Sequence, residues 1–300
     1  MAIESEAAMS DNTARSFRDK WEQNPTLALA QTLDERSEIF RWILGRNGFR
    51  DSGELRAFLA GKARVLDAGC GNGRVTALLR THSDAGETEV VGIDLVAADV
   101  ARRNLERFPN VKVLQKDLLG ELGDLGRFDF IYCQEVLHHT ADPERAFRNV
   151  ASLLAPGGEI AIYVYARKAP VREFVDDYVR ARVAELPYEE VIRVSEQITA
   201  LGKSLAEAKA EIEVPDIPVL GIAAGRYDVQ RFVYHFFMKC FWNPELNFHD
   251  NAVINYDWYH PQLCSRHTLE EVRTWFAGLE LEIVHECVDF YGITVRGRRA

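Results

Sequence analysis

A glycine-rich stretch near residue 70 constrains the fold more than any other part of the chain. An apolar pair of residues leads to Asp67, and Gly69, Gly71 and Gly73 then occupy alternate positions before an apolar segment with helical spacing. This order predicts a buried strand, a tight turn and a helix. Glycine permits positive φ in such a turn and lets a ligand lie against the backbone. The helix start adds free N–H groups and the positive end of a dipole.

Length and charge exclude several classes of protein. The chain has 300 residues, enough for one large domain or two average ones, and a net charge of −10. The acidic balance argues against a nucleic-acid partner, which needs a basic surface. Because no run of 18 apolar residues occurs, we expect no membrane partner. The N-terminus lacks the pattern of a signal peptide, and the five scattered cysteines indicate reduced thiols in a cytoplasmic protein without a metal site.

Strand and helix patterns alternate between residues 61 and 166. This alternation predicts an α/β fold with a doubly wound, mostly parallel sheet, which binds ligands at the carboxyl ends of its strands. Asp142 is expected to cap a helix whose first residue is Pro143. After the first strand, the expected strands cover residues 90–94, 111–117, 128–135 and 159–165.

The remaining segments predict additions to this core. We expect residues 1–15 to be disordered, and capping boxes at Thr32 and Thr268. Residues 281–285 and 290–295 predict a terminal antiparallel hairpin. The aromatic stretch 226–259 is compatible with a lid over the strand ends and with a small core of its own. The expected domains are a helical cap at 1–60, the core at 61–166, a helical and aromatic lid insertion at 167–262, and the end of the core at 263–300.

The residues around the glycine turn distinguish two kinds of cofactor. In the dinucleotide fingerprint the third glycine follows the second by three residues, and here Arg74 occupies that place. Asp67 would repel a pyrophosphate but suits a ligand with an ammonium group. Asp94 can bind ribose hydroxyls, and Asp117 with Leu118 can meet an adenine. Acidic residues at three strand ends therefore favour S-adenosylmethionine (SAM) over a dinucleotide.

Together these motifs resemble a class I SAM-dependent methyltransferase. The resemblance rests on residues 65–73, 92–94, 115–118, 128–140 and 154–158, and covers about residues 60–165 with the closing hairpin. It implies a seven-stranded sheet whose last strand is antiparallel. It also implies SAM as cofactor, with its methionine part against the turn and its methyl group near residues 134 and 135. The cofactor-binding residues that the resemblance implies are Asp67, Gly69, Cys70, Gly71, Asn72, Gly73, Asp94, Leu95, Asp117, Leu118, Gln134 and Glu135.

Methyl transfer mainly requires alignment of the reactants and exclusion of water. A base is needed only when the nucleophile must lose a proton. Each candidate histidine also fits a structural role, and none shows the spacing of metal ligands. The candidates for a catalytic role are His138, His139, Tyr165, His235 and His260.

The aromatic insertion favours a small, largely apolar or aromatic acceptor, of the kind used in specialised metabolism. Arg226, Arg231, Lys239 and Arg266 could bind an anionic group on it, as a prenyl diphosphate would need, or could be ordinary surface charges. Two alternatives stay open: methylation of tRNA or protein, and SAM binding without methyl transfer. The N-terminal helix is also compatible with a homo-oligomer.

Overall fold

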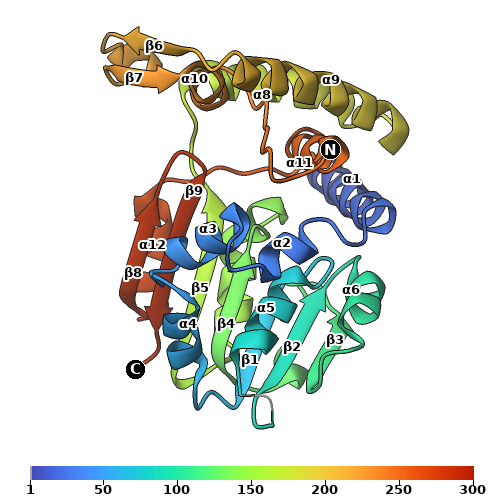
Figure 1. Ribbon diagram of the computed structural model, residues 1–300. Helices are drawn as coiled ribbons and strands as arrows, with labels where there is room; N and C mark the ends of the chain where they lie inside the picture. The colour runs from blue at the N-terminus through green and yellow to red at the C-terminus, as the bar shows by residue number, and fades with distance from the viewer. Residues whose placement is uncertain (1, 85) are drawn as a thin grey trace. The chain divides into compact units, whose positions relative to one another are not determined.

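A seven-stranded sheet organises one of the two units into which the described chain, residues 2–84 and 86–300, divides (Figure 1). We call residues 21–166 and 265–300 the sheet unit. The strand order is β3-β2-β1-β4-β5-β9-β8, with β9 antiparallel to both of its neighbours and the first five strands parallel. The predicted α/β sheet with an antiparallel last strand is thereby confirmed. The strands are β1 (Arg64–Ala68), β2 (Glu89–Asp94), β3 (Val111–Gln115), β4 (Phe128–Gln134), β5 (Leu154–Tyr165), β8 (Glu282–Val288) and β9 (Gly292–Arg298).

Helices cover both faces of this sheet. Successive residues of a strand point to opposite faces, so Val65 packs with α3, α4 and α5 while Leu66 packs with α7 and α12. Phe130 and Ile131 in β4 divide between the same two layers. The sheet is therefore doubly wound, as predicted. The helices of this unit are α2 (Leu29–Leu33), α3 (Glu38–Arg46), α4 (Ser52–Leu59), α5 (Arg74–His82), α6 (Ala98–Leu105), α7 (Pro143–Ala151) and α12 (Leu269–Ala277), with 3-10 turns at Gly123–Leu125 and Leu137–His139.

Two of the three predicted helix starts are confirmed. Asp142 caps α7 by accepting a hydrogen bond from Arg145 N, and Thr268 forms a capping box with α12. The capping box at Thr32 is wrong, because its hydroxyl donates to Ala28 O at 2.7 Å from within α2. A hydroxyl bonded back to a carbonyl cannot cap the next helix, and Ser37 caps α3 instead.

The helical unit comprises residues 2–20 and 167–264. The expected disorder of residues 1–15 is wrong for its described part, because α1 covers this segment. Polar side chains anchor the helix: Asn12 donates to Ala184 O at 2.5 Å, and Thr13 accepts from Leu263 N at 2.9 Å. These contacts group residues 2–20 with the insertion, while the functional division into cap, core and lid stays a prediction. The elements are α1 (Ala2–Gln23), α8 (Pro170–Val183), α9 (Tyr188–Glu207), β6 (Glu211–Val214), a 3-10 turn (Pro218–Leu220), β7 (Gly225–Asp228), α10 (Val229–Phe236) and α11 (Phe248–Tyr259).

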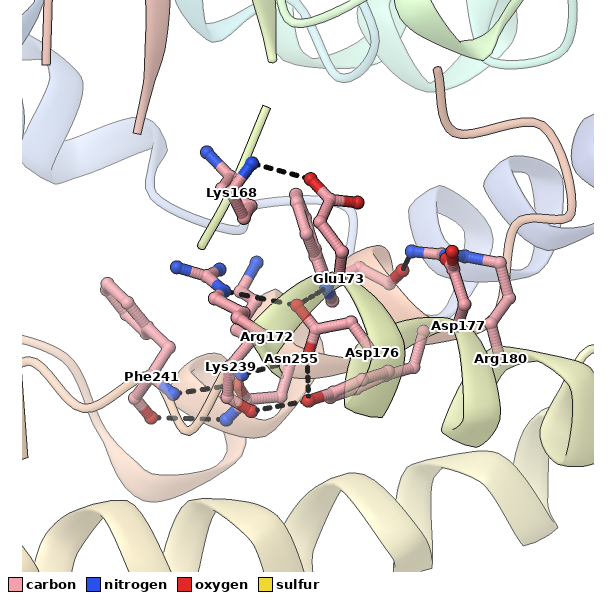
Figure 2. Close-up of polar contacts among 11 residues, drawn as sticks. Lys168, Arg172, Glu173, Asp176, Asp177, Arg180, Lys239, Phe241 and Asn255 are labelled. Atoms are coloured by element: carbon pink, nitrogen blue, oxygen red, sulfur yellow. Dashed lines mark hydrogen bonds and ion pairs between the residues drawn. The ribbon is translucent and has the colours of Figure 1, made fainter. Parts of the chain in front are cut away.

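A buried carboxylate lies at the centre of the helical unit (Figure 2). Asp176 is fully buried and accepts hydrogen bonds from Arg172 Nε at 3.1 Å and Lys239 N at 3.0 Å. It also accepts from Trp258 Nε1 at 2.7 Å and Tyr259 O–H at 2.9 Å. Buried charges require such partners, so this carboxylate connects α8 to α11 and to the segment between α10 and α11.

The aromatic stretch builds a small core within the same unit. The ring of Phe232 lies 5.6 Å from that of Tyr227, 5.3 Å from Phe236 and 5.5 Å from Phe237, measured between centroids. These rings pack on the antiparallel β6–β7 hairpin, which the sequence did not predict. A satellite core is therefore present, and a lid role stays a prediction. In the part of the chain that the structure describes, no helix has both the length and the apolarity that a bilayer crossing needs.

Two helical glycines provide a test of the packing. A Cβ at Gly202 in α9 would lie 2.4 Å from Cys240 O, whereas one at Gly45 in α3 would meet no atom within 4 Å. We expect Gly202→Ala to lower the free energy of unfolding by about 1–3 kcal/mol, because the backbone at Cys240 must shift. The matched control, Gly45→Ala, should raise it by about 0.5–1 kcal/mol. Denaturant unfolding followed by fluorescence measures the free energy of unfolding of both variants. Equal effects of the two substitutions would contradict the close approach of Gly202 to the Cys240 backbone.

Candidate functional site

The glycine turn follows β1 and has the backbone geometry that its sequence predicts. Gly69, Gly71 and Gly73 have φ values of 83°, 53° and 87°, in the left-handed region. A Cβ at Gly71 would lie 2.8 Å from the Trp21 ring, so Trp21 lies directly against the turn. Larger residues would meet both backbone strain and a clash at this position.

Asp67 lies in β1, two residues before the first glycine, and is almost fully buried at 1% exposure. Its Oδ2 accepts a hydrogen bond from Thr76 Oγ1 at 2.6 Å. Burial raises the pKa of this carboxyl to about 7, although the Thr76 hydrogen bond and the positive charge of Arg74 lower it. An ammonium group placed beside Asp67 would favour its charged form.

Asp94 connects the glycine turn to the next strand. Its Oδ2 accepts from Gly71 N at 2.9 Å, and its Oδ1 accepts from Val96 N at 2.9 Å and Ala97 N at 2.8 Å. A carboxylate offers about four acceptor sites, so these three bonds leave room for a ligand hydroxyl. Contact with both ribose hydroxyls stays a prediction.

The residues expected at the adenine differ in their exposure. Leu95 follows β2 and is 43% exposed, whereas Leu118 is 6% exposed and packs into the sheet core. Asp117 is exposed, and its Oδ1 accepts from Leu119 N at 2.9 Å. Leu95 and Asp117 therefore have side-chain surface for a ligand, and Leu118 has little.

Two of the predicted cofactor residues use their side chains to hold the fold. Asn72 is fully buried, and its Nδ2 donates to Pro25 O at 3.1 Å and Leu27 O at 3.0 Å. Cys70 is 5% exposed and packs beside Gly92, and burial raises the pKa of its thiol. Both residues could meet a cofactor through their backbone.

The end of β4 brings together Gln134 and Glu135. Glu135 has φ of 60°, which is uncommon outside glycine and typical of functional sites. It pairs with Arg74 Nη2 at 3.0 Å, while Arg74 Nη1 donates to Thr32 Oγ1 at 3.2 Å. Gln134 is 7% exposed and accepts from Tyr132 O–H at 2.6 Å. In the sequence, Arg74 is notable only as the residue in the place of the third fingerprint glycine, although a cation so close to predicted site carboxylates is a usable signal of a role in the site.

Three of the catalytic candidates lie together in the sheet unit. The His138 ring centroid lies 3.7 Å from that of Tyr165 and 4.3 Å from that of His139. His138 is fully buried and His139 is 9% exposed. The cluster follows the carboxyl ends of β4 and β5, which is the edge where such sheets bind ligands.

The other two candidates, His235 and His260, belong to the helical unit. His260 is fully buried, with Nδ1 at 2.9 Å from Ser16 Oγ and Nε2 at 3.0 Å from Leu186 O. Burial lowers the pKa of His260, which disfavours its charged form. These contacts favour a structural role for His260. His235 lies half-buried on α10, with its ring 5.1 Å from that of Tyr234.

The basic residues flanking the insertion have varied surroundings. Arg226 is largely exposed and pairs with Glu211 across the β6–β7 hairpin, which favours its interpretation as a surface charge. Arg231 lies 5.9 Å from the Tyr234 ring, and Lys239 lies 5.1 Å from the Trp258 ring. Within residues 2–84 and 86–300, no group of three or more metal-binding side chains is placed to hold an ion.

Comparison with known proteins places this geometry in context. A family model described as a methyltransferase domain matches residues 44–286. A ubiquinone biosynthesis O-methyltransferase from Coxiella burnetii is 36% identical over 110 residues, which cover 36% of this chain and 45% of the relative. A tRNA U34 carboxymethyltransferase from Campylobacter hominis is 34% identical over 144 residues, covering 47% and 46%. The chain therefore spans less than half the length of these relatives.

The fold is also similar to that of a solved structure. An O-methyltransferase family protein from Burkholderia thailandensis is 13% identical, with a TM-score of 0.45. The alignment covers 82% of this chain and 52% of that one.

The buried Asp67 predicts a pH-dependent stability. Because its folded pKa of about 7 exceeds the ordinary value near 3.8, the folded protein holds more protons between these values. The contribution of Asp67 to the free energy of unfolding therefore falls as the pH rises from about 4 to about 7, by up to about 1.4 kcal/mol per pH unit. Above about pH 7 this contribution is constant. Asp67→Asn should remove this slope, which denaturant unfolding across the pH range measures. Parallel pH curves for the two proteins would contradict the assignment.

Proposed function

Because the chain belongs to the family of SAM-dependent methyltransferase domains, we propose that it transfers a methyl group from SAM to a small acceptor. The acceptor we propose is largely apolar or aromatic and carries an anionic group. The observation that carries this proposal is the linked arrangement of Asp67, Gly71 and Asp94 at adjacent strand ends. It combines a backbone open to close approach with two carboxylates.

The residues present fit SAM. Asp67 is a buried carboxyl that lacks a cationic partner within hydrogen-bond distance among the described contacts, and the ammonium of SAM would supply one. Asp94 would hold the ribose, and Leu95 and Asp117 would border the adenine. When bound, SAM supplies a methyl group already activated by its sulfonium. The protein then has to align the acceptor and exclude water.

The proton of the acceptor, where it has one to lose, would pass to the cluster of His138, His139 and Tyr165. His139 is the more exposed of the two histidines. Its ring lies 5.6 Å from that of Tyr165, at the edge where the sheet would receive its ligands. We propose His139 as the first candidate base, with His138 packed behind it.

Two features support a small acceptor. The net charge of −10 disfavours a macromolecular polyanion. The Coxiella relative is also named as an O-methyltransferase of ubiquinone biosynthesis. The Campylobacter relative, whose name describes action on tRNA, supports the second candidate, a tRNA substrate. A cytoplasmic location and a role in specialised metabolism stay predictions.

Substitution at Asp94 tests the cofactor site. Asp94→Asn keeps the side-chain volume but removes a charged acceptor of three backbone N–H groups, so we expect S-adenosylhomocysteine to bind about 10–100-fold more weakly. The matched control is Asp99→Asn on α6, where the carboxylate is 82% exposed and pairs with Arg102. Isothermal titration calorimetry measures both variants. Equal affinities would contradict the assignment of Asp94.

Activity is tested by incubating the protein with labelled SAM and a panel of phenols, carboxylic acids and bulk tRNA, read by mass spectrometry and scintillation. We expect label on a small acceptor. Label on tRNA would favour the second candidate. Binding of SAM without transfer to any member of a broad panel would favour a SAM-binding protein without activity. Failure to bind SAM would overturn the whole proposal.

A further inference from the structure

A chain of buried hydrogen bonds in the sheet unit ends at Gln134. Asn47 Nδ2 donates to Ile43 O at 2.8 Å and to Tyr132 Oη at 2.9 Å, and the Tyr132 O–H donates to Gln134 Oε1 at 2.6 Å. The three side chains are all at least nine-tenths buried. They link α3, through its capping residue Asn47, to the carboxyl end of β4.

The donors and acceptors in these hydrogen bonds can be assigned from their chemistry. Ile43 O can only accept, so the amide nitrogen of Asn47 must face it, and the second hydrogen of that nitrogen occupies Tyr132 Oη. The single O–H of Tyr132 then donates to Gln134 Oε1. Burial raises the pKa of Tyr132, so its hydroxyl stays protonated and remains a donor. Gln134 therefore accepts through Oε1, and its Nε2 faces away from Tyr132. This Nε2 is buried and has no hydrogen-bond partner among the described atoms.

A second buried donor without a partner lies on α3, against the neighbouring strand β5. Arg46, 3% exposed at the end of α3, places its guanidinium 4.5 Å from the Tyr163 ring and 5.0 Å from the Trp42 ring. Its Nε donates to Thr294 Oγ1 at 3.1 Å and its Nη1 pairs with Asp289. Its Nη2 has no hydrogen-bond partner among the described atoms.

Strand register relates the positions of Gln134 and Arg46. Gln134 in β4 pairs with Tyr163 in the parallel strand β5, and residues paired in this way point to the same face. Gln134 therefore lies beside the ring on which Arg46 stacks. Buried N–H groups without partners are rare in folded proteins, and a ligand or an ordered water satisfies them when they occur.

We propose that Gln134 Nε2 and Arg46 Nη2 bind a carboxylate of the methyl acceptor, with Trp42 and Tyr163 against its apolar part. This inference rests on the proposed function and names the anionic group of its acceptor. Two N–H donors, one of them on a guanidinium, match the two oxygens of a carboxylate. Asn47 and Tyr132 act as positioning residues that aim the Gln134 amide. The set replaces Arg226 as the expected anion site and lies wholly in the sheet unit.

The test uses the full chain saturated with S-adenosylhomocysteine and three pairs of probes. Each pair is an acid and its primary amide: benzoate and benzamide, 4-hydroxybenzoate and 4-hydroxybenzamide, cinnamate and cinnamamide. We expect at least one acid to bind about tenfold or more tightly than its amide, the range expected for charge-assisted hydrogen bonds. Calorimetric titration gives both affinities.

Four variants then locate the preference. Gln134→Met removes the amide at similar volume, Arg46→Lys removes Nη2 while keeping a charge for Asp289, and Tyr132→Phe removes the hydrogen that orients Gln134. Each should reduce the ratio of acid to amide affinity to about threefold or less. The control is Arg64→Lys at the start of β1. The guanidinium of Arg64 also stacks on an aromatic ring, 4.4 Å from that of Phe128, and it pairs with Glu89 at the start of β2. This substitution should leave the ratio unchanged.

The outcomes separate this inference from the proposed function. Wild-type protein that fails to bind S-adenosylhomocysteine would contradict the proposed function. Protein that binds it, but shows no acid preference in any pair or a preference that survives Gln134→Met and Arg46→Lys, would overturn only the carboxylate site. A crystal structure with an ordered water between the two donors and the acid elsewhere would overturn it as well.

Discussion

The hydrogen bonds that Asp94 accepts hold the glycine turn after β1 against the end of β2, and the proposed cofactor site depends on this arrangement. The turn after β1 needs positive φ at its glycines and therefore exposes backbone N–H groups. Asp94 accepts one of these from Gly71, and two more from Val96 and Ala97 at the start of α6. One carboxylate thus connects the ends of two parallel strands. Because charge-assisted bonds of this kind are strong, the turn is held in shape by the protein itself.

The segment before α2 is fixed to the same turn. Asn72 donates to Pro25 O and Leu27 O, and Asn104 also donates to Pro25 O, at 2.7 Å. Trp21 lies against Gly71. Two amide side chains near the turn therefore hold residues 21–28 in place, which explains why Asn72 has no side-chain donor left for a cofactor. The same contacts place residues 21–28 against the turn that is proposed to bind the cofactor.

The sheet and the glycine turn could be predicted because their signals are local. Alternating burial, the positions of glycines and the acidic residues after strands all lie within a few residues of one another. Other features depend on partners that sequence spacing does not reveal. Asn12 contacts Ala184, and Arg46 contacts Asp289 and Thr294, so neither the order of α1 nor the burial of Arg46 has a local signal. The fully buried His260 belongs to the same class, since its partner Ser16 lies in α1.

Arg46 and Arg172 are both buried and both stack on aromatic rings, but the groups around them differ. Arg172 lies 4.6 Å from the Tyr234 ring and pairs with Asp176, whose oxygens receive four hydrogen bonds that return to the helical unit itself. That network closes around the carboxylate of Asp176, and Arg172 Nη1 is a guanidinium nitrogen there without a hydrogen-bond partner among the described atoms. At Arg46 the neighbouring hydrogen bonds run in one direction, from Asn47 to Tyr132 to Gln134, and end on a donor. At this end of β4 two donors, on Gln134 and on Arg46, lack partners, and this pair supports the proposal that an acceptor from outside the chain binds there.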